Sequence, residues 1–219
     1  MEITYYGHST FKLKGKLGTV VTDPFPPKVG WALPTLSTDI ITVSHDHYDH
    51  NAVAKLSGTA RRAQPFVVSK PGEYEVGGVS VFGVKTYHDD QHGAERGDNT
   101  VFTILMDDVK LCHLGDLGHE LSPEQLDEIG VVDVLFCPVG GVYSLDPKLA
   151  VKVIQQVEPS YVIPMHYRTP QHAAELASLA TVEDFLKEYG VSPTPQPKLN
   201  LEKGKIPEET ELVILEVQT

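Results

Sequence analysis

The sequence predicts an α/β (α+β) fold in which two mixed β-sheets pack face to face, with helices on the outside. Short apolar runs of strand length recur along the chain and are joined by tight polar or glycine turns. Helix signals stand between these hairpins at only a few places. No repeat period, heptad run or linker is visible, so we expect residues 1–219 to form a single domain.

The first third of the chain is expected to begin with a meander of three strands, over 3–6, 10–13 and 18–22, with Lys14-Gly15-Lys16 as its polar turn. Residues 25–39 contain three prolines and the only tryptophan, Trp31, and read as an irregular loop. A structureless stretch of this length is often a lid or binding loop, although packing onto the domain is the favoured role for Trp31. A buried strand over 40–43 and a short helix over 51–57, stopped by Gly58, should follow.

The middle third reads as strands alone. Segments 65–69, 73–76 and 79–84 are separated by short turns, among them the hairpin dipeptide Gly77-Gly78. Segments 99–106 and 109–114 form another hairpin that turns at Asp107-Asp108. These strands should belong to a largely antiparallel part of a sheet.

The last third alternates helices and strands. Ser122 opens a capping box with Pro123 at the first helical position, and Gly130 ends that helix. Asp146 caps a second helix with one apolar face, and Thr181 caps a third. Strands are expected over 131–137, 161–164 and 212–217.

Charge and composition exclude several classes of function. Thirty acidic and eighteen basic residues give a net charge of −12, which disfavours nucleic acids and anionic membranes as partners. No secretory signal or membrane-spanning segment is visible. Cys112 and Cys137 form no Cys-x-x-Cys motif, so we expect buried, reduced thiols and a cytoplasmic protein.

The segment 45–50 packs three histidines and two aspartates into six positions, directly after the apolar strand. Imidazole and carboxylate are the groups that zinc and its neighbours prefer. In an extended chain His45, His47 and Asp49 face one side and His50 the other, so one ion cannot easily take all four. We therefore expect His45 and His47 at one metal, and Asp49 and His50 at a second. A solvated surface loop and a single metal site are the alternatives.

The pattern His-x-His-x-Asp-His over 45–50 resembles the signature of the metallo-β-lactamase superfamily. The chain is similar to its small cytoplasmic metal-dependent hydrolases, the group that includes ascorbate-phosphate lactonase-like proteins. Further motifs come in the family's order: Gly7-His8-Ser9, Asp23-Pro24, His88, Gly115-Asp116 and Pro164-Met165-His166-Tyr167. The resemblance implies a four-layer αββα sandwich.

The remaining ligands are expected at other strand ends. His88 is the favoured third ligand of the first metal, with His92 and His113 as competitors. Asp116 could place one carboxylate oxygen on each ion, unless it only binds backbone amides in a turn. His166 is the expected last ligand of the second metal.

Four other polar residues have candidate roles near the site. His8 either contacts the metal ligands and handles protons or is structural, Asp23 is expected as an anchor near the site, and His113 should lie beside the ligands rather than on a metal. Arg168 either meets an anionic substrate group or pairs with surface acids.

The expected function is that of a metal-dependent hydrolase acting on a small molecule, with Asp49 and Asp116 as its catalytic carboxylates. Two divalent ions, with zinc preferred and manganese or iron as alternatives, would ionise a water near neutral pH. That hydroxide would attack an ester, lactone, amide or phosphoester. A nuclease of the same superfamily and a non-catalytic metal-dependent ligand-binding protein are the alternatives. A homo-oligomer is left open.

Overall fold

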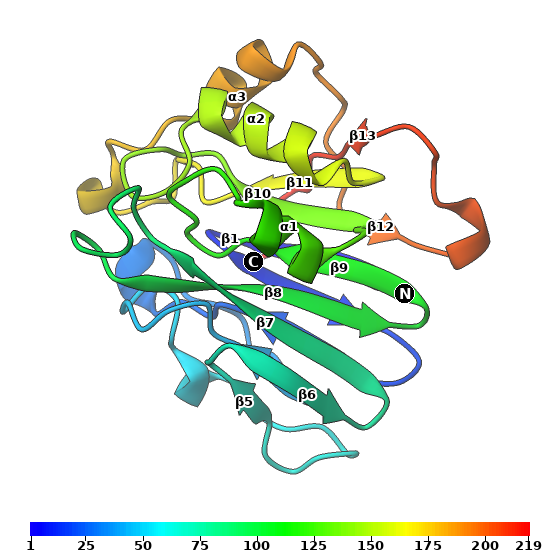
Figure 1. Cartoon of the computed structure of the whole chain (residues 1–219). Coiled ribbons are helices and arrows are strands. Elements are labelled where there is room, and N and C mark those ends of the chain that lie inside the picture. Colours follow the sequence, from blue (N-terminus) through cyan, green and yellow to red (C-terminus); the bar gives the residue numbers. More distant parts are fainter.

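The computed structural model describes residues 1–219 and contains two mixed β-sheets that face each other (Figure 1). The predicted pair of packed sheets is confirmed. The first sheet has the order β12-β1-β2-β3-β4-β5 and comprises β1 (Glu2–Gly7), β2 (Thr10–Lys14), β3 (Thr19–Thr22), β4 (Ile40–Thr42), β5 (Phe66–Val68) and β12 (Leu199–Asn200). The second has the order β13-β11-β10-β9-β8-β7-β6 and comprises β6 (Gly72–Val76), β7 (Val79–Tyr87), β8 (Asp98–Met106), β9 (Val109–His113), β10 (Val134–Pro138), β11 (Tyr161–Met165) and β13 (Glu211–Leu212).

Each sheet has an antiparallel half and a parallel half. Strands β1 to β3 form the expected antiparallel meander, and β4 and β5 then add in parallel. In the second sheet β6 to β9 are antiparallel, whereas β9, β10, β11 and β13 are parallel. Because the carboxyl ends of parallel strands meet at one edge, the residues that follow β4, β9 and β11 can converge.

The core lies between the two sheets and is closed by aromatic residues from both. The ring of Phe11, on β2, lies 4.3 Å from that of Phe136, on β10, and 4.6 Å from that of Tyr5. All three side chains are fully buried. This contact joins the sheets directly behind the edge where the polar side chains gather.

Three α-helices were expected after residue 120 and three are found, α1 (Pro123–Ile129), α2 (Pro147–Val157) and α3 (Val182–Tyr189). The side chains of Ser122, Asp146 and Thr181 cap their first turns as predicted. Helix α1 packs against β7, and α2 packs on β10 with α3 beside it (Figure 1). None of the helices has the length and apolar character needed to cross a membrane.

Two elements differ from the prediction. The helix expected over 51–57 is only a 3₁₀ turn, Val53–Lys55, because no side chain caps its start and Leu56 is already extended. The closing strand expected over 212–217 is regular only at Glu211–Leu212. Beyond it the chain crosses to the first sheet, where Val217 forms a bridge with Tyr5.

The proline-rich loop over 25–39 is packed rather than open. It contains a 3₁₀ turn, Pro27–Val29, and Val29 and Phe25 form a small apolar cluster with Leu176. The indole of Trp31 lies 4.8 Å from the ring of Phe25, which agrees with the packing role favoured for it.

Candidate metal centre

The residues expected to bind metal lie at one edge of the sandwich, each beyond the end of a strand. The loop after β4 carries His45, His47, Asp49 and His50. The other three come from the second sheet: His88 after β7, Asp116 beyond β9, and His166 after β11. The structure therefore brings together residues from His45 to His166, which are 121 positions apart (166 − 45) in the sequence.

The potential ligand atoms form two groups, in each of which they lie within 4.8 Å of one another. The first group consists of His45, His47 and His88. The second group consists of His8, Asp49, His50 and His166. His45 and His47 thus fall in one group and Asp49 and His50 in the other, as proposed from the sequence, although simple alternation would have set Asp49 beside His45 and His47. His8 is an additional member. Asp23 also lies within the same distance of two ring nitrogens, those of His45 and His50.

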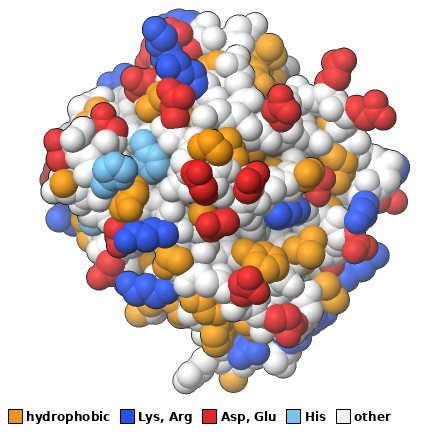
Figure 2. Space-filling model, viewed as in Figure 1, with side chains coloured by type: hydrophobic (Ala, Val, Ile, Leu, Met, Phe, Trp, Pro, Cys, Tyr) orange, Lys and Arg blue, Asp and Glu red, His pale blue; other side chains and the backbone are white.

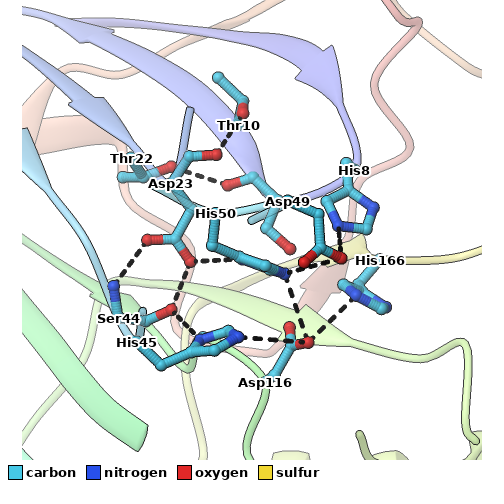
Figure 3. A network of polar contacts seen from close by, with 12 residues as sticks. His8, Thr10, Thr22, Asp23, Ser44, His45, Asp49, His50, Asp116 and His166 are labelled. Carbon is cyan, nitrogen blue, oxygen red and sulfur yellow. Dashed lines mark hydrogen bonds and ion pairs between the residues drawn. The ribbon is translucent and has the colours of Figure 1, made fainter. Parts of the chain in front are cut away.

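The Asp116 carboxylate lies between the two groups (Figure 3). Its Oδ2 atom is 3.1 Å from Nε2 of His166 and 3.4 Å from Nε2 of His50, both in the second group. The same oxygen is 3.4 Å from Nε2 of His88 and 4.0 Å from Nε2 of His45, in the first group. One oxygen atom thus faces four imidazole rings from both groups, whereas one oxygen for each ion was expected.

Several of these buried atoms have no hydrogen-bond partner. They are the Nε2 atoms of His45, His50, His88 and His166 and the Oδ1 atom of Asp116. Buried polar atoms are nearly always paired in folded proteins, so a convergent set of unpaired imidazole nitrogens needs an explanation. A divalent cation fits, since neutral imidazole and carboxylate are its preferred ligands.

The ligands differ in protonation in the metal-free fold. Burial would lower the pKa of His50 and of His88, but Asp116 raises both, that of His50 well above its ordinary value, so these two rings must release a proton to bind metal. Burial lowers the pKa of His45, and the neighbouring His50 lowers it further, to about 2, so that its ring is neutral at pH 7. Burial would raise the pKa of Asp116, but His166 and His50 hold it well below its ordinary range. A neutral imidazole and an ionised carboxylate are the forms that bind metal.

Asp23 and Ser44 hold two of the rings in place. His50 Nδ1–H donates to Asp23 Oδ2 at 2.9 Å, and the Ser44 hydroxyl donates to the same oxygen at 2.5 Å. Since that hydroxyl has only one hydrogen, Ser44 Oγ accepts from His45 Nδ1–H, 2.9 Å away. In their neutral forms both rings therefore carry their hydrogen on Nδ1 and direct Nε2 at the centre (Figure 3).

A second set of contacts fixes the turn that carries Asp116. The backbone N–H of Asp116 donates to Asn99 Oδ1 at 3.0 Å, and that of Gly115 donates to His113 Nδ1 at 3.2 Å. Gly115 has φ +58°, and a Cβ atom there would lie 2.3 Å from Asn99 Oδ1. His113 Nε2–H donates to the Ser9 carbonyl at 2.9 Å. His113 therefore supports the turn and belongs to neither group.

A cleft of about 570 Å³ opens over the centre. His47, Asp49, His88 and Asp116 form its floor, and its walls are lined by Tyr48, Tyr143, Leu176, Glu175 and Arg96, among others. Arg168 is not among the residues that line it, and its guanidinium donates to the Ala177 carbonyl at 3.0 Å. The ion pairs that lysines and arginines form in the structure do not include Arg168.

Sequence reasoning missed three side chains in this region. Ser44 stands between a buried strand and the first histidine, which was the only signal for its role. Asn99 is a buried amide in an otherwise apolar strand. Such a residue can indicate a side chain that forms hydrogen bonds to a neighbouring turn. Nothing in the sequence around Arg96 indicates a role at the site, because only the fold brings its loop to the cleft.

Comparisons with known proteins agree with this geometry. The model of the beta-lactamase superfamily domain matches residues 2–166. A UPF0173 metal-dependent hydrolase of Thermococcus onnurineus is 30% identical over 199 residues, which cover 80% of this chain and 88% of the relative.

Solved structures with the same fold include two metal-dependent or hydrolytic proteins. A crystal structure of a candidate zinc-dependent hydrolase of the metallo-β-lactamase superfamily from Thermotoga maritima is 38% identical, with a TM-score of 0.79 over 99% of both chains. The isothiocyanate hydrolase from Delia radicum gut bacteria has a TM-score of 0.65 over 100% of this chain and 98% of its own, at 14% identity. The second likeness is one of fold alone.

Proposed function

The chain belongs to the metallo-β-lactamase superfamily and is a metal-dependent hydrolase, and from this membership we propose that it uses two metal ions to cleave an ester, lactone, amide or phosphoester bond of a small molecule. The observation that carries the proposal is the position of Asp116 Oδ2, within 4.0 Å of imidazole nitrogens from both groups. One carboxylate shared by two sets of ligands is the arrangement expected of a bridged pair of ions.

In this proposal the first group holds one ion, while Asp49, His50 and His166 hold the other, and zinc is the preferred metal. When bound, such ions supply a Lewis acid for the substrate oxygen and lower the pKa of water to about 7. Asp116 offsets the mutual repulsion of the two positive charges. Asp23 and Ser44 favour the tautomer of neutral His50 and His45 that has no hydrogen on Nε2, and they fix the direction of both rings.

The cleft supports a small molecule as substrate. Its volume of about 570 Å³ is in the range of small-molecule pockets, and two tyrosines and Leu176 offer contacts to an apolar group. Arg96 lies on its rim, and its nearest carboxylate is Glu95 at 4.0 Å, so its guanidinium is available to an anionic substituent of the substrate. The net charge of −12 disfavours a nuclease, which needs positive charge to bind the phosphate backbone.

Elemental analysis and a substrate screen test the proposal together. Purified protein should contain two equivalents of divalent metal, with zinc predominant, and should hydrolyse at least one of a panel of chromogenic esters, lactones and phosphodiesters. Chelation should abolish turnover, and added zinc should restore it. One equivalent of metal at saturation, or turnover that survives complete removal of metal, would contradict the two-metal mechanism.

A further inference from the structure

A line of hydrogen-bonding groups leads from Asp49 away from the cleft. Asp49 Oδ2 is 3.2 Å from His8 Nε2, and His8 Nδ1 is 3.4 Å from His172 Nε2. On its far side, His172 Nδ1 accepts a hydrogen bond of 3.0 Å from the backbone N–H of Thr169. His8 is fully buried, and His172 is half-buried. His172 lies at a separate surface pocket, of about 500 Å³, and has no part in the cleft.

The backbone amide of Thr169 fixes the direction of the whole line. An amide N–H can only donate, so Nδ1 of a neutral His172 carries no hydrogen and its hydrogen is on Nε2. That N–H faces Nδ1 of His8, which must then accept. The hydrogen of His8 is consequently on Nε2, where it is directed at the Asp49 carboxylate. The opposite tautomer at either ring would set two hydrogens or two lone pairs against each other.

The two rings are held by packing as well. Trp31 meets His172 edge to face, with ring centroids 5.0 Å apart, and the indole N–H donates to the Tyr6 carbonyl at 3.3 Å. A Cβ atom at Gly7 would lie 2.2 Å from the indole, so only glycine leaves room for this position of Trp31. The His8 backbone is fixed too, because its carbonyl accepts from the Tyr5 hydroxyl and from His166 N–H, each at 2.8 Å.

From this geometry we propose that His172 is a positioning residue for the second group. Through the tautomer of His8, it presents an N–H donor to Asp49 and so orients that carboxylate toward His50 and His166. Donors behind metal-binding carboxylates generally raise metal affinity by 10- to 100-fold. The effect on metal affinity rests on the proposed function, whereas the tautomers of His8 and His172 do not.

Two substitutions at His172 and one control elsewhere separate hydrogen bonding from packing. His172→Phe keeps an aromatic ring beside Trp31 but has no donor, and His172→Gln keeps an N–H that can reach His8. His92→Ala is the matched control, because His92 is an exposed histidine outside both groups. Thermal unfolding of the metal-free proteins verifies that each variant is folded. Zinc affinity at each of the two sites is then measured by competition with a chromogenic chelator.

In His172→Phe we expect one of the two zinc sites to lose about tenfold or more in affinity while the other keeps its own. His172→Gln should recover part of the loss, and His92→Ala should match the wild type. Wild-type affinity in His172→Phe, or equal losses in the Phe and Gln variants, would overturn the proposal.

The tautomers are tested without metal. Long-range ¹H–¹⁵N NMR spectra of the metal-free wild-type protein should show the hydrogen on Nε2 in both His8 and His172. A hydrogen on Nδ1 of either ring would overturn the proposal even if two zinc ions bind. The expected tautomers in a protein that takes up only one zinc would support the hydrogen-bonded line and count against the two-metal function instead.

Discussion

Among single residues, Asp116 offers the sharpest test of the centre, because one of its oxygens faces both groups. Asp116→Ala should reduce bound metal from two equivalents to one or fewer and abolish turnover. Removal of the Asp116 carboxylate also leaves four imidazole rings without the negative charge that they surround. Elemental analysis of the variant, with circular dichroism to verify folding, measures the effect. Two equivalents of metal and full activity in the variant would reject a bridging role.

The two cysteines provide a prediction that does not depend on metal. Both are free and buried, as expected from the sequence. Burial disfavours the thiolate and raises the pKa of Cys112 to about 12, and it raises the pKa of Cys137 as well. At pH 8 both therefore stay protonated in the folded protein. An aromatic disulfide reagent should label neither thiol in the native state and both in denaturant, and rapid native labelling would contradict the burial of these side chains.

Among the helices, α2 offers the clearest test of how a helix cap contributes to the stability of the fold. Asp146 caps it by accepting from Leu149 N–H at 2.7 Å, and the helix packs on β10, which runs in parallel beside β11, the strand that leads to His166. Asp146→Ala should lower the free energy of unfolding by about 1 kcal/mol, the usual cost of a lost N-cap. Asp146→Asn, which can still cap, should lose less. Urea denaturation monitors both, and metal content should not change in either variant.

The regular elements were largely predictable because their signals are local. Alternating apolar residues give the strands, and capping residues such as Ser122 mark the helix starts. The segment after Asn51 has the composition of a helix but no cap, and a 3₁₀ turn forms instead. The end of the chain, near Val217, has strand propensity, but its partner is β1, at the other end of the sequence. No local pattern reveals such a pairing.

Over the whole molecule, the part of the site that lies close together in the sequence could be predicted from local patterns, whereas contacts between distant residues could not. His45 to His50 stand together in the sequence, and alternation separates His50 from His45 and His47. Alternation would also place Asp49 with those two, whereas the structure groups Asp49 with His50. The contact between His8 and His172 joins residues 164 positions apart and leaves no trace in either local sequence. The same holds for Arg96, which lines the cleft while Arg168 does not. Supporting contacts depend on tertiary packing, and so does the approach of His88, Asp116 and His166 to the motif at 45–50, from which they stand far apart in the sequence.

Binding of metal should stabilise the whole fold, because the ligands come from strands of both sheets. A ligand that binds only the native state at 100 times its Kd adds about 2.7 kcal/mol per site. For a chain of 219 residues, each kcal/mol corresponds to roughly 2–4 °C in melting temperature. Saturating zinc should therefore raise the melting temperature of the metal-free protein by roughly 5–10 °C per site. Differential scanning calorimetry with and without zinc measures this shift.

The pH dependence of that shift has a defined sign. Metal binding requires neutral imidazole, and in the metal-free fold Asp116 raises the pKa of His50 and of His88 against the effect of burial, so protons compete with zinc for these rings. The stabilisation by zinc should therefore be larger at pH 7.5 than at pH 5 and should shrink steadily as the pH falls between them. Asp116→Ala is the control, with a smaller shift at every pH because it holds less metal. A zinc-induced shift of equal size at pH 5 and pH 7.5 would mean that these histidines are not the ligands.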